Sequence, residues 1–189
     1  MKKFYIIMGH PNVNSFNGYL ANEYEKKLTK LGYQVRRQNL GELKFDPILH
    51  KGYKEIQDLE DDLVKAQENI KWADEIIIIY PLWWGTIPAL LKGFIDRIFL
   101  PGFAFKYHNN DPFWDKLLKG KTARIFSTCD SPEVYQNLWL LNTDFILLKR
   151  AILGFSGIKV KQTKRISNLI KKDLKQCKEI VAKIISKIK

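Results

Sequence analysis

Three short segments of the chain carry residue types that suit a flat, anionic ligand. Residues 9–17 read GHPNVNSFN, residues 81–86 read PLWWGT, and residues 127–135 read STCDSPEVY. The first precedes a predicted helix, whose free N–H groups and dipole favour a phosphate. The second offers two adjacent indole rings, which suit a planar apolar contact. The third offers hydroxyl groups. Residue types alone therefore make the first segment a candidate anion site and the second a candidate contact for a planar ring, and each also has an ordinary structural explanation.

Each of these segments follows a stretch that is typical of a buried β-strand. Residues 3–8 and 75–80 are almost continuously apolar, and residues 121–128 alternate in a strand-like manner. Pro81 is expected to end the hydrogen-bond ladder because it has no N–H. If the strands are parallel, the three segments lie at one edge, where open α/β sheets bind their ligands.

The remaining elements alternate between helix and strand. Strands are predicted at 33–40 and 158–166, and helices at 16–31, 54–73, 89–99, 140–154 and 169–188, with an irregular aromatic segment at 101–115. Gly32 is expected to stop the first helix. Buried stripes are predicted in three helices: Leu20, Tyr24 and Leu28; Ile56, Leu59, Leu63, Ala66 and Ile70; and Leu174, Cys177, Val181 and Ile184.

This alternation predicts an α/β fold with a five-stranded parallel sheet and helices on both faces. Strand order 2-1-3-4-5 fits five strands with right-handed crossovers, and the polar second strand suits a sheet edge. Residues 1–189 are expected to form a single domain because they contain no Pro-, Gly- or Ser-rich linker.

Composition and charge narrow the function classes. The net charge of +12 is compatible with nucleic acid or anionic ligands, but it accompanies no nucleic-acid-binding motif, and a lysine-rich solvated surface explains it more simply. The two cysteines form no CxxC pair and no metal-ligand cluster with the three histidines. The apolar run at residues 4–8 is too short for a signal peptide, so a cytoplasmic protein without a bound metal is expected.

A longer run, PLWWGTIPALLKGFIDRIFLPGFAFKY at residues 81–107, resembles the NAD(P)H:quinone oxidoreductase family of flavodoxin-like flavoproteins. The resemblance implies a flavodoxin-like three-layer α/β/α fold, a homodimer, and a flavin, either FMN or FAD. It also implies hydride transfer from NAD(P)H through that flavin to a quinone or similar flat acceptor. FMN is favoured because the chain is compact, and no recognisable motif distinguishes NADH from NADPH.

The same resemblance assigns roles to individual positions. It places His10, Ser15, Phe16 and Asn17 at the flavin phosphate, and Pro81, Leu82, Trp83, Trp84 and Gly85 at the ring. Ser127, Thr128, Cys129 and Asp130 match the segment at the ring's pyrimidine edge, and Tyr135 matches a residue that hydrogen-bonds the acceptor. Phe105 and Tyr107 match aromatic residues that line the substrate pocket, often from the neighbouring subunit.

Two departures from the family pattern concern the third segment. Cys129 and Asp130 stand where well-known quinone reductases have glycines, and residues 136–144 contain no histidine for a proton path. Asp130 therefore either places a carboxylate near the flavin or points to solvent, and Cys129 is either a redox thiol or a small apolar filler.

Structural and functional alternatives remain beside these assignments. Ser15 alone suits an ordinary helix N-cap, His10 can simply pack in a turn, and a tryptophan can cover a core or a dimer contact. A regulatory role is a further alternative, because some members of the resembled family are ancillary subunits of potassium efflux transporters. A basic nucleic-acid-binding protein without a cofactor is a more distant one.

Overall fold

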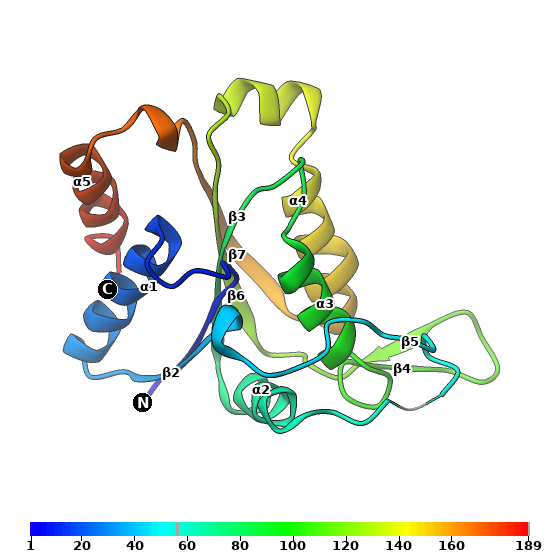
Figure 1. Ribbon diagram of the computed structural model, residues 1–189. Coiled ribbons are helices and arrows are strands. Elements are labelled where there is room, and N and C mark those ends of the chain that lie inside the picture. The colour runs from blue at the N-terminus through cyan, green and yellow to red at the C-terminus, as the bar shows by residue number, and fades with distance from the viewer. Residues whose placement is uncertain (56, 189) are drawn as a thin grey trace.

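The computed structural model describes residues 1–55 and 57–188 and is built around a parallel sheet (Figure 1). Its strands are β1 (Lys3–Met8), β2 (Gln34–Asn39), β3 (Glu75–Pro81), β6 (Thr122–Thr128) and β7 (Lys159–Ile166). They lie in the order β2-β1-β3-β6-β7, which is the predicted order 2-1-3-4-5 of the five long strands. The polar strand β2 occupies one edge, as predicted.

Helices cover both faces of this sheet, which confirms the predicted three layers (Figure 1). One face is covered by α1 (Phe16–Lys30) and α5 (Leu174–Ile185). The other is covered by α2 (Asp61–Trp72), α3 (Ala89–Ile98), α4 (Thr143–Ile146) and the π-helical turns of η3 (Leu147–Gly154).

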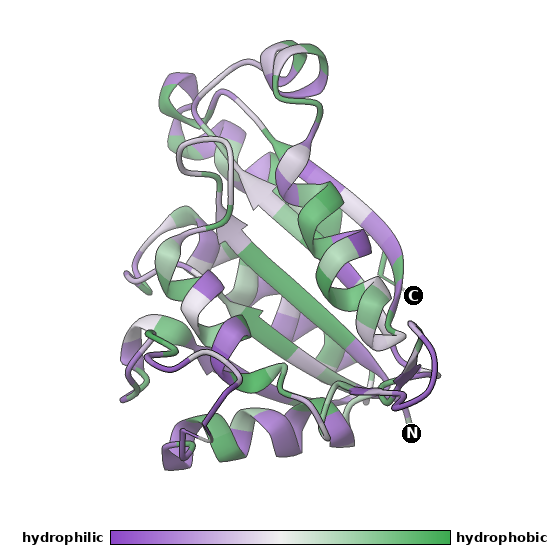
Figure 2. Ribbon diagram, turned by 90° about the vertical axis from the view of Figure 1, so that its right-hand side faces the viewer, coloured by the Kyte–Doolittle hydropathy of each residue, from purple (hydrophilic) through white to green (hydrophobic). Residues whose placement is uncertain are grey.

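Side-chain alternation along β3 supplies both cores. Ile76, Ile78 and Tyr80 pack toward α2 and α3, whereas Ile77 and Ile79 pack toward α1 and α5. Every residue of β3 is buried, and the middle strands of the sheet are mostly coloured as hydrophobic in Figure 2. A continuous apolar run is what a strand covered on both faces requires. In the part of the chain that the structure describes, no helix is both long enough and apolar enough to cross a bilayer.

Four helix and loop boundaries differ from those predicted. The helix expected over 54–73 begins only at Asp61, and the helix expected over 140–154 is the short α4 continued by η3. The helix expected over 169–188 is split into η4 (Leu169–Lys171) and α5, because Asp173 caps α5 through a capping box. The aromatic segment contains an antiparallel hairpin of β4 (Phe105–Tyr107) and β5 (Trp114–Lys116).

The predicted buried stripes are confirmed only in part. Leu20, Tyr24 and Leu28 are buried, as are Leu63, Ala66 and Ile70, whereas Ile56 lies outside the described residues. In the last helix Val181 is buried, but the prediction for Leu174 was wrong because its side chain is 71% exposed at the first turn of α5. Gly32 does stop α1, with a φ of 81°.

The prediction that Pro81 ends the ladder was also wrong by one step. Pro81 pairs with Thr128, and the Leu82 N–H donates to the Thr128 carbonyl at 2.7 Å. The carbonyl of Ile79 accepts from Gly9 on the β1 side, so the nitrogen of Pro81, two residues later, faces that same side. Because β1 has already ended there, no N–H is needed and the proline is tolerated.

A buried carboxylate lies at the amino-terminal end of the central strand β3. Glu75 is fully buried and receives hydrogen bonds of 2.5 Å from Lys2 Nζ and 2.5 Å from Arg124 Nε. Burial by itself would raise the pKa of Glu75, but these hydrogen bonds and the two positive charges hold it below its usual value.

Replacing this carboxylate should weaken the acid sensitivity of folding. A carboxyl group whose pKa is lower in the folded than in the unfolded protein stabilises the fold at pH values above its unfolded-state pKa. This contribution is lost as the pH falls through its folded-state pKa. The free energy of unfolding of the Glu75→Gln variant should therefore change less between neutral and acidic pH than that of the parent. Urea titrations at several pH values measure this. Glu68→Gln, at an exposed position on α2, is the control, and equal pH slopes for parent and Glu75→Gln would contradict the prediction.

Candidate functional site

The three segments predicted to form a site do meet at the carboxyl edge of the sheet. The rings of His10 and Trp83 lie edge to face with centroids 5.6 Å apart, which joins the first segment to the second. The Leu82 N–H bonds to the Thr128 carbonyl, which joins the second to the third. Asn17 Nδ2 lies 3.0 Å from Thr128 Oγ1, which joins the third to the start of α1.

Two glycines fix the path of the first segment. A Cβ built on Gly18 would lie 1.8 Å from the Val13 carbonyl oxygen, and one built on Gly41 would lie 1.9 Å from the Pro11 carbonyl oxygen. The segment therefore runs between the first turn of α1 and the turn that follows β2. Since these contacts are with backbone atoms, any larger residue must displace the segment itself.

We expect Gly18→Ala to displace this segment and weaken anion binding at α1. The added methyl group cannot be accommodated without moving Val13, and overpacking of this kind costs about 1–3 kcal/mol of stability. Thermal unfolding together with titration by FMN or inorganic phosphate measures the two effects. Thr29→Ala, at an exposed position of the same helix, should change neither quantity. Unchanged anion affinity in a folded Gly18→Ala variant would contradict this role of the segment.

The N-terminus of α1 offers free donors beside this segment. Ser15 is the N-cap and its Oγ accepts from the Gly18 N–H at 3.3 Å, so the plain N-cap reading of Ser15 is correct. The N–H groups of Phe16 and Asn17 have no acceptor among residues 1–55 and 57–188. Unpaired N–H groups at a helix start, together with the helix dipole, form an anion site. Asn17 itself is buried, and its amide is engaged with Thr128.

His10 sits partly buried at the rim of this site. Its Nδ1 lies 2.9 Å from the Asn12 nitrogen, which donates to it, and the turn holds the ring against Trp83. Partial burial lowers the pKa of His10 below its ordinary value, so the ring is neutral near pH 7. A neutral imidazole can donate from Nε2 to a phosphate without carrying a charge.

The second segment is a tight turn that exposes its tryptophans. Trp83 and Thr86 exchange two backbone hydrogen bonds of 3.1 and 3.0 Å around Trp84 and Gly85. Both central residues are left-handed, with φ of 50° for Trp84 and 74° for Gly85. Such a conformation costs a residue with a side chain about 1–2 kcal/mol, and strain of this kind collects at functional sites.

The exposure of this turn agrees with the prediction of two accessible rings. Trp83 is 44% exposed and Trp84 is fully exposed, while Pro81 and Leu82 are buried beneath them. The N–H groups of Trp84 and Gly85 have no acceptor in the described part of the chain. The turn therefore presents indole surface and unpaired N–H groups together, which is what a flat ring with carbonyl and nitrogen edges needs.

In the third segment, three residues expected at the ring's pyrimidine edge contact other parts of the protein instead. Ser127 is fully buried and its hydroxyl accepts from Arg165 Nη1 at 3.0 Å. The Cys129 side chain is 7% exposed and packs near Ser131 and Ser167, which fits a small filler. Asp130 is exposed and its Oδ1 accepts from the Ile170 N–H at 3.0 Å, on the side of the loop after β7.

A buried polar row beneath the site was not predicted from the sequence. Tyr80, Ser127 and Arg165 are direct neighbours across β3, β6 and β7. The Tyr80 hydroxyl donates to Asp144 Oδ2 at 2.7 Å, and Arg165 Nη2 donates to Asp144 Oδ1 at 2.7 Å. Burial, followed by the Asp144 carboxylate, raises the pKa of Tyr80 well above its usual value, which keeps the hydroxyl protonated as the donor.

This polar row holds down the segment that carries Tyr135. Arg165 Nη2 also donates to Asn142 Oδ1 at 3.1 Å, and its guanidinium lies 4.4 Å from the centre of the Phe145 ring. Residues 131–142 rise from the sheet as an arm above α4 (Figure 1). The one sequence signal was Asp144 itself, a lone acidic residue within the apolar run at residues 138–148.

Tyr135 stands on this arm and is 46% exposed, in the π-helical turn η2 (Tyr135–Trp139). The arm ends beside the tryptophan turn, because Thr143, the residue that follows it, donates from Oγ1 to the Gly85 carbonyl at 3.0 Å. The arm and the turn are therefore linked, although the hydroxyl of Tyr135 has no partner among the described residues.

Phe105 and Tyr107 are not brought to the site within one chain. They lie on the β4–β5 hairpin and line a cavity of about 300 Å³ beside Ile95, Asp96 and Phe99, near the end of α3. The tryptophan turn precedes the start of that ten-residue helix, and such a helix is about 15 Å long. Within one chain, the two aromatic residues therefore lie about one helix length away from the tryptophan turn.

Comparison with known proteins agrees with the fold and identifies the family. The model of a family described as having a flavodoxin-like fold matches residues 2–188. An uncharacterized NAD(P)H oxidoreductase of Haemophilus influenzae is 38% identical over 132 residues, which is 67% of this chain and 63% of that protein. Ribosyldihydronicotinamide dehydrogenase [quinone] of Pongo abelii is 31% identical over 186 residues, covering 84% of this chain and 78% of that protein.

Among solved structures, Smu.1420 from Streptococcus mutans UA159 is 28% identical with a TM-score of 0.81, and the match covers 97% of each chain. These similarities confirm the resemblance that the segment at residues 81–107 carries.

Proposed function

The chain belongs to the family of flavodoxin-like proteins that includes NAD(P)H oxidoreductases, and we propose that it is a flavin-dependent enzyme that oxidises NAD(P)H and reduces a quinone or a similar flat acceptor. One observation carries the proposal. Unpaired N–H groups at the start of α1 and the exposed indole of Trp83 lie at a single sheet edge, joined through His10. A phosphate site beside an aromatic surface is what FMN requires.

The residues at this edge fit FMN, and each has a role that its geometry supports. The N–H groups of Phe16 and Asn17 would bind the phosphate, with His10 and Ser15 at the rim. The rings of Trp83 and Trp84 and the free N–H groups at Trp84 and Gly85 would hold the isoalloxazine. Bound flavin supplies the hydride chemistry, accepting two electrons from NAD(P)H and delivering them to the acceptor. FMN is preferred over FAD because the donors at the start of α1 provide for one phosphate group, which is what FMN carries.

Beneath the candidate site, buried side chains support the residues that would contact the flavin and do not contact it themselves. Ser127, and Asn17 through its side chain, are engaged inside the protein, while Thr128 ties α1 to β6. Cys129 fills space, and Asp130 is directed to the loop after β7 and away from a ring bound at the tryptophan turn. The carboxylate would then not oppose negative charge on the reduced ring.

We assign Tyr135 a hydrogen bond to the acceptor oxygen. Its exposed hydroxyl stands on the arm that contacts Gly85, beside the tryptophan turn. The Tyr135→Phe variant should bind flavin as the parent does but reduce quinone more slowly, by about tenfold to a hundredfold if the bond forms to a developing charge. Steady-state turnover and flavin titration measure the two quantities. Unchanged turnover would remove Tyr135 from the mechanism.

The functional unit in this proposal is a cytoplasmic homodimer. Several large apolar side chains are exposed on the arm and next to it: Trp84, Val134, Leu138, Trp139, Leu141 and Ile146. Large exposed apolar side chains concentrated in one short segment support association. A second subunit would also bring Phe105 and Tyr107 to the site that they do not reach in their own chain. The two cysteines, Cys129 and Cys177, are free, which suits a reducing compartment.

The proposal is tested by turnover with paired substrates. Under anaerobic conditions, purified protein reconstituted with FMN should oxidise more than one equivalent of NADH or NADPH per flavin only when a quinone is added. Light scattering should give the mass of a dimer. Absence of turnover with every quinone, azo or nitroaromatic acceptor tried would contradict the assigned reaction.

A further inference from the structure

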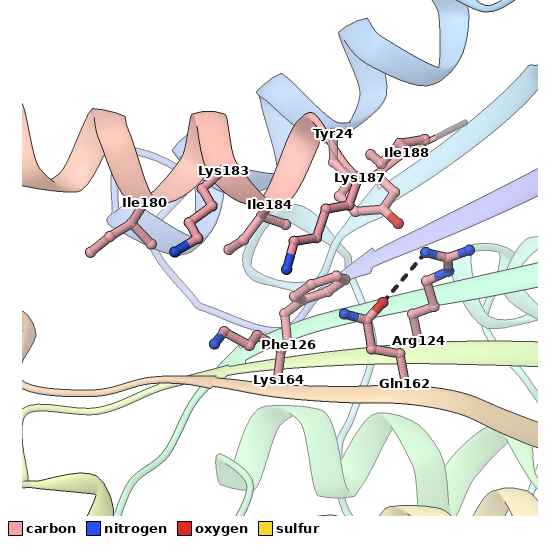
Figure 3. A pocket seen from close by; sticks show the side chains of 10 residues that line it. All are labelled: Tyr24, Arg124, Phe126, Gln162, Lys164, Ile180, Lys183, Ile184, Lys187 and Ile188. Atoms are coloured by element: carbon pink, nitrogen blue, oxygen red, sulfur yellow. Dashed lines mark hydrogen bonds between the residues drawn. The ribbon is translucent and has the colours of Figure 1, made fainter.

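A second cavity lies on the face of the sheet that α1 and α5 cover, away from the candidate site at the carboxyl ends of the strands. It has a volume of about 220 Å³ and lies between α5 and strands β6 and β7 (Figure 3). Its apolar wall is formed by α1, α5 and β6 through Tyr24, Phe126, Ile180, Ile184 and Ile188. No residue assigned to flavin or acceptor binding lines it.

Basic side chains gather over this apolar wall. Lys183 of α5 and Lys187, which follows that helix, extend toward the sheet, and Lys164 reaches the same space from β7 (Figure 3). Within residues 1–55 and 57–188, no carboxylate pairs with any of these three ammonium groups. By contrast, the fourth cation, Arg124, is engaged by Glu75 and by Gln162.

Unpaired like charges around one apolar space point to an anionic ligand. The three lysines are exposed, so water screens the repulsion between their ammonium groups, but an anion seated among them would interact with three positive charges at once. The wall beneath them has Phe126 at its centre in Figure 3, and the polar lining residues Arg124 and Gln162 are hydrogen-bonded to each other. A ligand with a charged head and an apolar body satisfies both parts of the cavity.

The size of the cavity restricts that ligand further. Pockets for drug-sized molecules measure roughly 300–1,000 Å³, whereas one water occupies about 30 Å³ of liquid. The volume of about 220 Å³ therefore suits a molecule larger than a few waters and smaller than a nucleotide. We propose that this cavity binds a small monocarboxylate with an apolar tail, its carboxylate among Lys164, Lys183 and Lys187 and its tail against Phe126 and Ile184.

Octanoate is a suitable probe, and the matched uncharged probe is octanol. Isothermal titration of the full-length protein, with saturating FMN present to occupy the site at the sheet edge, should show saturable binding of octanoate below its micellar concentration. Octanol should bind at least fivefold more weakly. The double variant Lys183→Ala/Lys187→Ala should lose at least fivefold in octanoate affinity, whereas Lys175→Ala/Lys178→Ala, on the same helix outside the cavity, should not.

A variant that fills the cavity tests whether binding requires the cavity volume as well as the lysine charges. Ile184→Trp should abolish octanoate binding while keeping the lysines, and thermal unfolding and FMN titration verify that each variant is folded. Equal binding of octanol and octanoate would overturn the proposal, as would full affinity in Lys183→Ala/Lys187→Ala. Loss of FMN on addition of octanoate would also overturn it, because the probe would then occupy the site at the sheet edge.

Discussion

Replacing Asp144 with alanine should destabilise the protein by about 3–5 kcal/mol, because it leaves the buried guanidinium of Arg165 without a negative charge to balance it. Asp144 and Arg165 are 1% and 2% exposed at their side chains, and their closest atoms are 2.7 Å apart. The Tyr80 hydroxyl would lose its acceptor at the same time. Urea denaturation at neutral pH measures the change, and the arm at residues 131–142 should become more sensitive to protease.

A surface ion pair supplies the control for this prediction. Lys92 and Asp96 pair at 2.8 Å on α3, but their side chains are 45% and 36% exposed. Exposed pairs contribute about 0.2–1 kcal/mol, so Asp96→Ala should have a small effect. Removing both buried charges, in Asp144→Leu/Arg165→Met, should cost less than Asp144→Ala alone. If Asp144→Ala proved as mild as Asp96→Ala, the buried polar row would not hold the arm.

The Trp83→Ala variant should lose about tenfold to a hundredfold in affinity for FMN. Removing an aromatic surface on which a heteroaromatic ring stacks costs about 1–3 kcal/mol, and 1.4 kcal/mol is a factor of ten in affinity. Trp83 is 44% exposed, so little of the fold depends on its burial. Fluorescence titration with FMN measures the affinity, and thermal unfolding should shift little.

The conservative replacement distinguishes stacking from a structural role. Trp83→Phe keeps a flat ring in contact with His10 and should retain most of the FMN affinity. If Trp83→Ala bound FMN as tightly as the parent, Trp83 would not contact the ring. Equal losses in Trp83→Phe and Trp83→Ala would mean that the indole is required for more than stacking.

The fold could be predicted because its information is local. The isoleucine run of β3 and the alternation of strands with helices determine a parallel sheet, and polar residues in β2 place it at an edge. Positions that depend on caps and long-range contacts could not be predicted in the same way. The capping box at Asp173 divides the last helical segment, which leaves Leu174 exposed.

The sequence predicted which segments meet at the candidate site, but it did not predict which of their side chains are buried or what they bond to. Strand order alone brings His10, Trp83 and Thr128 to one edge. The burial of Ser127 and its bond to Arg165 depend on a row across three strands, which spacing along one chain does not reveal. The clamp of Gly18 and Gly41 on the first segment likewise depends on contacts between distant backbone atoms.

The visible spectrum of the purified protein, recorded anaerobically before and after addition of NADH or NADPH, tests the central proposal most directly. We predict a flavin absorption band, either as purified or after reconstitution with FMN, that bleaches when the pyridine nucleotide is added. A colourless protein that neither FMN nor FAD reconstitutes would contradict flavin binding at the edge formed by His10, Trp83 and the start of α1. A flavin band that neither nucleotide bleaches would contradict the proposed NAD(P)H oxidation.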